Sequence, residues 1–250
     1  MRDVQQILDH FPSYSTAQSQ RGTVYVSVPS ENPDTIVYNI PVPLAPVFPG
    51  EDIGLHSPLE ALRIAINTWE NHQNRGCNDL VLLNLQGARL GRLDLERFKR
   101  QINYCLMPNG TCTDKNMQSG WRYRYDHDFN YIARVGIWFE NFALPVVINE
   151  CLLQSYTGHL RLFPNWPMDK AAGFHQFRAV GAFLVSAECA KRQVDYVRVQ
   201  AEVGGPLKLI NPWPGQVKVV RDQGITTMSG KLIELDTKPL ECVLFLPQGG

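Results

Sequence analysis

The sequence predicts an α+β protein in which a helical N-terminal part is followed by an antiparallel β-sandwich. Three observations support this fold class. Apolar residues recur with helical period before Gly158 and alternate with strand period after it. Glycine and proline punctuate the alternating segments, as they do between sandwich strands. The chain has 250 residues, 44% of them hydrophobic, which is enough to bury two cores.

The first expected elements are a short helix and a β-hairpin. Residues 3–10 have helical period, and residues 22–28 alternate β-forming side chains. Residues 35–40 are the expected partner strand. Prolines then fix an extended path that ends at Gly50.

Three helices are expected next. Ser57 followed by Pro58 is typical of a helix start with Ser57 as the N-cap residue. This helix places Trp69 on its apolar face, where core packing is the expected role of the indole. Asp79 and Asp94 are expected to cap the next two helices.

A fourth helix is expected over Phe142–Ser155, and it is apolar on almost all sides. Glu140 and Asn141 directly precede it, where free backbone N–H groups and the helix dipole favour negative charge. The alternative is that either residue only caps the helix. Glu150 lies inside the helix and is expected to be a paired structural charge or an active-site acid.

Aromatic side chains gather just before this helix, in the segment 117–129. Tyrosine and tryptophan have an apolar ring with a polar edge, which suits a sugar ring with its apolar face and its hydroxyl groups. Core packing is the alternative role. The residues expected to contact a substrate are Trp121, Tyr123, Asp126 and Trp138.

Strands are expected from His159 onward, and the two domains are therefore expected to be 1–157, with the short N-terminal hairpin, and 158–250. The later part has no long helical pattern. The expected strands are 159–163, 179–187, 194–202, 207–211, 216–221 and 242–246.

Composition argues against several classes of function. The 24 basic and 24 acidic residues give zero net charge, which disfavours nucleic-acid binding. Apolar runs are too short for a membrane span, and the first residues do not resemble a secretory signal. The six cysteines form no C-x-x-C pair and the six histidines no H-x-x-x-H pair, so neither a metal site nor a cofactor is expected.

An ordered series of motifs resembles glycoside hydrolase family 95. The segment from Glu140 to Pro167 is similar to the family pattern D-G-N-F-G…E-M-L-L-Q-S…G-x-I-x-L-L-P. The likeness extends over roughly residues 40–215. Its further parts are Phe48-Pro49-Gly50, Ala88-Arg89-Leu90-Gly91, Phe177-Arg178-Ala179-Val180-Gly181 and Gly204-Gly205-Pro206.

The resemblance implies a partial α/α toroid of helical hairpins, followed by the small β-sandwich. It implies hydrolysis of α-linked sugars such as α-L-fucosides with inversion, which needs a general acid and a base that activates water. Glu140 stands one position after the family's Asp and is the implied base, and Asn141 is implied to bind water or a sugar hydroxyl. The family's acid lies upstream of the matched region. The chain therefore resembles the C-terminal part of a longer enzyme, of a family that is often exported.

Two other functions remain open at this point. A chain without the general acid is also consistent with a non-catalytic carbohydrate-binding remnant. An incomplete toroid exposes apolar helix faces, which favours an interaction protein that forms homo-oligomers or pairs with the missing N-terminal part.

Overall fold

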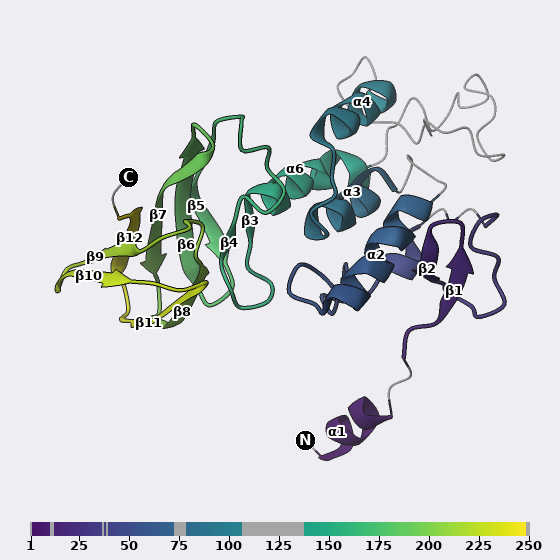
Figure 1. The fold of residues 1–250 in the computed structure, drawn as a ribbon, viewed down its shortest axis with the longest axis horizontal. Coiled ribbons are helices and arrows are strands. Elements are labelled where there is room, and N and C mark those ends of the chain that lie inside the picture. The colour runs from purple at the N-terminus through teal and green to yellow at the C-terminus, as the bar shows by residue number, and fades with distance from the viewer. Residues whose placement is uncertain are drawn as a thin grey trace. The chain divides into compact units, whose positions relative to one another are not determined.

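The computed structural model describes residues 2–10, 13–36, 38, 40–72, 79–106 and 138–248, and it leaves the side chains of 138–142 undescribed. The fold is mixed α and β, with antiparallel sheets, so the α+β prediction is confirmed. Helices dominate the early part of the chain and strands the later part (Figure 1). The chain divides into two compact units, Met1–Leu90 with Asp94–Phe142, and Gly91–Leu93 with Ala143–Gly250. We call them unit 1 and unit 2. The predicted boundary after residue 157 remains a prediction.

Unit 1 contains a β-hairpin with a partner strand other than the one expected. β2 (Gly22–Tyr25) pairs with β1 (Thr16–Ser19), which precedes it, and none of the described residues among 35–40 forms a strand. The hairpin turn is only two residues long, because Ser19 pairs directly with Gly22. Gly22 has a positive φ of 95°, which the tight turn requires. The helix expected near the N-terminus is α1 (Arg2–Asp9).

The helices of unit 1 follow the expected order. They are α2 (Leu59–Asn71), α3 (Asp79–Arg89) and α4 (Leu95–Cys105), and the short 3-10 helix η1 (Val42–Leu44) precedes them. Asp94 caps α4 as predicted, since its carboxylate accepts hydrogen bonds from the backbone N–H groups of Glu96 and Arg97.

The predicted cap at Ser57 is wrong. Pro58 is the N-cap residue of α2, which places Ser57 one residue too early to reach the free N–H groups of the first turn. The Ser57 hydroxyl accepts a hydrogen bond from the Gly54 N–H at 3.0 Å instead.

Trp69 lies in the core of unit 1, as expected. Its indole N–H donates to the Leu83 carbonyl at 2.8 Å, so the ring is held between α2 and α3. Gly87 of α3 packs against the ring so closely that an added Cβ would lie 2.9 Å from it. The other core residues of this cluster include Tyr25, Leu44, Val47, Ile53, Ala65 and Leu90.

Helix α6 (Trp138–Leu152) is the apolar helix of the prediction, displaced toward the N-terminus. It begins at Trp138 and not at Phe142. It ends at Leu152 because the next two residues form β3 (Leu153–Gln154), which pairs with β4 (Arg161–Leu162). Pairing with a later strand competes with continuation of the helix, and a local apolar pattern does not reveal it.

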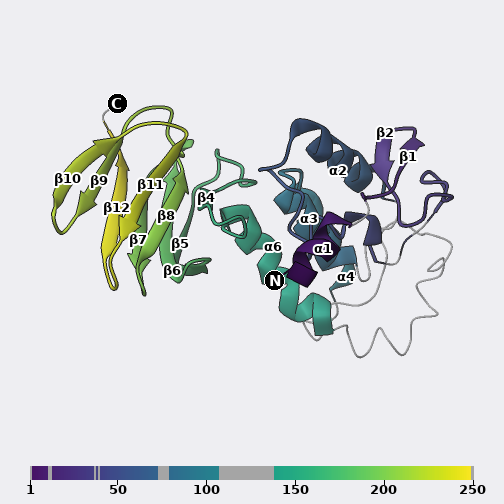
Figure 2. The same cartoon turned by 90° about the horizontal axis from the view of Figure 1, so that it is seen from below.

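The strands of unit 2 form a six-stranded antiparallel sheet in the order β10-β9-β12-β7-β6-β5 (Figure 2). A second sheet pairs β8 with β11, and Leu160 forms an isolated bridge with Leu209 of β8. The expected antiparallel arrangement after His159 is therefore confirmed. The remaining bounds are β5 (Ala172–Ala179), β6 (Phe183–Ala190), β7 (Gln193–Ala201), β8 (Gly205–Ile210), β9 (Val217–Arg221), β10 (Gly224–Met228), β11 (Leu232–Thr237) and β12 (Cys242–Pro247).

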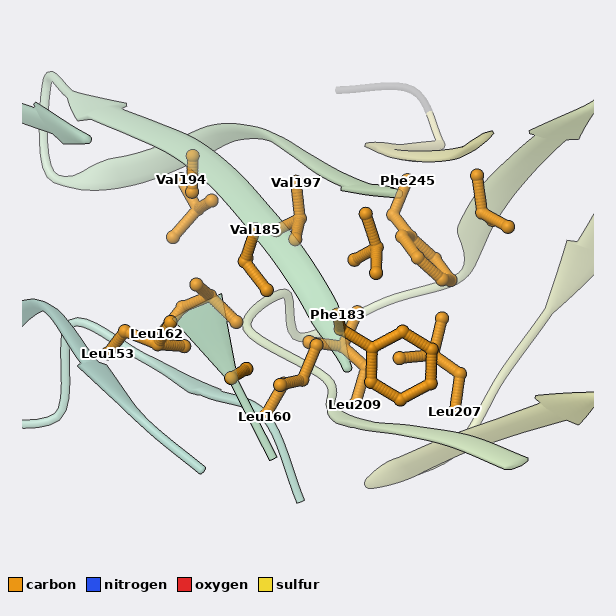
Figure 3. Close-up of a cluster of buried hydrophobic side chains, with 14 of the residues drawn as sticks. Leu153, Leu160, Leu162, Phe183, Val185, Val194, Val197, Leu207, Leu209 and Phe245 are labelled. Atoms are coloured by element: carbon orange, nitrogen blue, oxygen red, sulfur yellow. The ribbon is translucent and has the colours of Figure 1, made fainter. Parts of the chain in front are cut away.

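Buried side chains from both sheets form a single core (Figure 3). Val185, Val197 and Phe245 come from the six-stranded sheet, and Leu207 and Leu209 come from β8. Alternating burial along β7 and β12 turns one face of the sheet toward this core. On the opposite face, Glu188 of β6 pairs with Tyr196 of β7, and both line a groove.

Candidate functional site

The predicted catalytic residues lie in the first turn of α6. Trp138, Glu140 and Asn141 are all helical, so Glu140 is inside the helix and does not precede it. The N-terminal turn is still the place where the helix dipole favours a carboxylate. Their side chains, and all of Trp121, Tyr123 and Asp126, lie outside what the structure describes. The assignment of these six residues therefore remains a prediction.

A groove of about 460 Å³ lies at the other end of α6, where the helix meets β5. We call it the Glu150 groove. Glu150 is half-buried in it, and this carboxylate is one of the two acids that the sequence singled out around α6. The other lining residues are Val146, Asn149, Leu153, Ser155, Tyr156, Gln176, Phe177, Arg178 and Val180.

The two walls of the Glu150 groove come from two of the sequence motifs that resemble glycoside hydrolase family 95. Glu150 and Ser155 belong to the segment after Glu140, and Arg178 and Val180 belong to the motif that begins at Phe177. The Ser155 hydroxyl joins them by accepting a hydrogen bond from the Val180 N–H at 3.1 Å.

A β-bulge shapes the second wall. The pairing of β5 with β6 shifts between Phe174 and Phe177, so His175 and Gln176 stand opposite the single residue Ser186. Gln176 has a positive φ of 54°, and its N–H donates to the Ser186 hydroxyl at 3.0 Å. The bulge therefore holds the exposed Gln176 side chain at the groove.

Arg178 brings a fixed positive charge to the groove. Its guanidinium donates to both carboxylate oxygens of Glu202, at 2.5 and 3.0 Å. The pair is bidentate, which orients the planar guanidinium, and both groups remain open to solvent. Sequence reasoning singled out neither Gln176 nor Arg178 for a role in binding, because a bulge depends on the partner strand.

The thiol next to Glu150 is structural. Cys151 is fully buried, and burial raises its pKa to about 12, with a smaller contribution from the negative charge of Glu150. Asn165 donates to this sulfur at 3.8 Å and also binds the backbone of Leu93. A thiol with so high a pKa is not a nucleophile at neutral pH.

The Glu150 groove has the chemistry of a polar-ligand site. A carboxylate, two amides, two hydroxyl groups and a guanidinium supply both acceptors and donors, and Leu153 and Phe177 add apolar surface. Glu150 is the one carboxylate that lines it among the described residues. The groove can therefore orient hydroxyl groups, but an acid–base pair of the inverting type would need a second carboxyl group.

The motifs of unit 1 also meet in space. Arg89, from the motif Ala88–Gly91, donates to the Val47 carbonyl and to Glu51, both at 3.2 Å, and its guanidinium lies 4.9 Å from the centre of the Phe48 ring. Gln86 donates to the carbonyl groups of Leu44 and Phe48. The buried Arg89 thus clamps the Phe48-Pro49-Gly50 turn onto the end of α3.

Within the described ranges, no three His, Cys, Asp or Glu side chains are grouped so that they could hold a metal ion. No helix in the same ranges is both long and apolar enough to cross a membrane.

The likeness of this chain to known proteins is distant. No family model and no curated protein matches the chain. The chain is similar to the crystal structure of Ara127N-Se, a GH127 beta-L-arabinofuranosidase from Geobacillus stearothermophilus T6, with a TM-score of 0.27 and 10% identity. The likeness covers 74% of this chain, which spans only 30% of that one. A TM-score of this size establishes no shared fold. The function of the chain is therefore inferred from its motifs and grooves.

Proposed function

We propose that this chain is a carbohydrate-active protein of the glycosidase type, or the C-terminal part of one. The observation that carries the proposal is the spatial pairing of the family-like motifs. Arg89 clamps the Phe48–Gly50 turn, and Ser155 joins the segment after Glu140 to the motif that contains Val180. These motifs resemble glycoside hydrolase family 95 in the same order along the sequence, and they also contact one another in space. Both features are expected if the chain has the architecture of that family, and neither is expected of a chance similarity.

In this proposal the reaction is the inverting hydrolysis of α-linked sugars such as α-L-fucosides. Glu140 is the base that activates or positions water, and Asn141 binds the water or a sugar hydroxyl. Trp121, Tyr123, Asp126 and Trp138 contact the sugar. The general acid comes from further helices of an α/α toroid, supplied by a longer chain or by a partner.

A second candidate function is carbohydrate binding without turnover. Among the described residues, Glu150 is the one carboxylate that lines the Glu150 groove, which favours this function, since hydrolysis with inversion needs two carboxyl groups. In both cases the partner is a carbohydrate, and neither nucleic acid nor a membrane is involved.

Both candidate functions require the chain to bind a sugar, and thermal unfolding with and without sugars tests this binding. A monosaccharide that binds the folded chain raises the melting temperature by mass action. We expect one or more of L-fucose, D-galactose, L-arabinose and L-rhamnose to do so. The proposal fails if none of them stabilises the chain.

Glu140→Gln separates turnover from binding. The exchange keeps the shape of the side chain and removes the charge that takes a proton from water. In the assembled enzyme, which also contains the general acid, we expect loss of the release of 4-nitrophenol from aryl α-glycosides, with nearly unchanged thermal stabilisation by sugar. Glu234→Gln, which alters an exposed carboxylate of β11, is the matched control and should change neither reading. Turnover that survives Glu140→Gln would exclude the proposed base.

A further inference from the structure

A second groove, of about 590 Å³, crosses the sheet face formed by β5, β6 and β7. We call it the Tyr196 groove. It shares no lining residue with the Glu150 groove. Its polar side chains are His175, Glu188, Asp195 and Tyr196, and its remaining lining residues are Ala171, Ala172, Gly173, Phe174, Cys189 and Ala190.

The hollow exists because its floor is built from small residues. Gly173 and Ala190 project little or nothing from the two strands where longer side chains would fill the space. Gly173 pairs with Glu188, and an added Cβ at Gly173 would lie 2.9 Å from the Cγ of Glu188. Glycine at this position therefore lets the Glu188 side chain lie across β5.

Tyr196 fixes the carboxylate of Glu188. The two residues pair across β6 and β7, and the Tyr196 hydroxyl donates to Glu188 Oε1 at 3.0 Å. Burial, together with this hydrogen bond, raises the pKa of Tyr196, so the phenol remains a donor. Gly173, Glu188 and Tyr196 thus form one row across three strands, with the acid held in place before any ligand arrives.

A second β-bulge turns another carboxylate toward the same hollow. The pairing of β6 with β7 passes from Glu188–Tyr196 to Cys189–Val194, which leaves Asp195 as the extra residue. Asp195 is close enough to Cys189 that its charge adds to the effect of burial in raising the pKa of that thiol. Asp195 and Tyr196 therefore line the groove as neighbours, although adjacent strand residues ordinarily face opposite sides.

We propose that the Tyr196 groove binds one sugar residue of a glycan and anchors it without chemical change. The Tyr196 ring supplies an apolar surface for the C–H face of the sugar, and Glu188 and Asp195 accept hydrogen bonds from neighbouring hydroxyl groups. The volume is that of a small-molecule site with a few placed polar groups. The choice of a sugar as ligand rests on the proposed function, whereas the position of the site rests on the row and the bulge.

Affinity electrophoresis in gels that contain fucosylated xyloglucan or galactomannan tests the anchoring groove. We expect the intact chain to be retarded by one of these polysaccharides. Tyr196→Ala should raise the dissociation constant at least tenfold, and Gly173→Ser, which refills the floor, should do the same. Tyr196→Phe should raise it only about twofold to threefold, because the ring remains. Melting curves confirm that each variant is folded, and Glu234→Gln is the matched control.

The outcomes separate this inference from the proposed function. Sugar binding by the Tyr196 groove is overturned if the intact chain, Tyr196→Ala and Gly173→Ser are retarded equally. It is also overturned if neither polysaccharide retards the intact chain. If monosaccharides still stabilise the chain in that case, the proposed function stands alone. Retardation that depends on Tyr196, in a chain that no monosaccharide stabilises, supports the groove and removes the glycosidase-type proposal.

Discussion

The carboxylate of Glu241 is buried, and hydrogen bonds from two neighbours hold it. Arg221 donates from Nε at 2.7 Å and from Nη2 at 2.9 Å, and the Lys238 N–H donates at 2.8 Å. Arg221 also donates to the Asp236 carbonyl, so the pair ties β9 to the end of β11. Removing one partner of a buried ion pair leaves the other charge without compensation. A substitution at Glu241 or Arg221 is therefore expected to lower the free energy of unfolding strongly.

We expect Glu241→Ala to lower the free energy of unfolding by about 2–4 kcal/mol. The matched control is Glu234→Ala, which breaks the exposed pair with Lys208 and should cost less than about 1 kcal/mol. Urea unfolding followed by circular dichroism measures both. Equal losses in the two variants would contradict the role given to burial.

The free energy of unfolding is expected to depend on pH through the same Glu241 carboxylate. Hydrogen bonds from Arg221 hold the pKa of Glu241 below its ordinary value of 4.5 in the folded protein. A depressed folded-state pKa stabilises the protein above the pKa of the unfolded chain, and this contribution is lost as pH falls through the folded value. Glu241→Gln should therefore flatten the decline in stability below about pH 4.5. An unchanged slope in acid would show that Glu241 does not contribute to it.

At the scale of elements, the contact between α2 and α3 depends on Gly87. We expect Gly87→Ala to lower the free energy of unfolding by about 1–2 kcal/mol, because the Trp69 ring must move from its hydrogen bond with Leu83. The better helix propensity of alanine offsets up to about 1 kcal/mol of the clash. Gly215→Ala, where an added Cβ meets nothing within 4 Å, is the control and should be neutral. A stabilised Gly87→Ala variant would refute the tight packing.

Local chemistry determines how well each element could be predicted. Asp94 was found because an N-cap acts within three residues, and the strand pattern of β7 was found because one face is buried. The partner of β2 and the strand β5 are not predicted, because pairing is decided between two strands and the pattern along one of them does not reveal it, even when a short turn joins the two. Helix α6 starts at Trp138, before the apolar run that predicts it. For the candidate site, the sequence identified Glu150, but the bulges that place Gln176 and Asp195 exist only in the paired sheet.

At the scale of the whole molecule, the apolar helix α6 predicts association. Val147 and Cys151 are buried, but Val146 on the same helix is 41% exposed. We expect the 250-residue chain to form homo-oligomers unless the missing part of the proposed toroid covers this surface. Light scattering after size exclusion should give a mass at or above twice 28.3 kDa, and Val146→Asp should lower it. A monodisperse 28.3 kDa species would contradict this expectation.

Direct binding of a sugar to the intact chain tests the central claim most directly. Saturation-transfer difference NMR with L-fucose, D-galactose, L-arabinose and L-rhamnose reports contact between sugar protons and protein without requiring turnover. A carbohydrate-active protein predicts transfer to one or more of these sugars, with the strongest transfer to protons on the face that packs against an aromatic ring. The absence of transfer to all of them, from a chain shown to be folded, would contradict both the glycosidase-type function and its non-catalytic alternative.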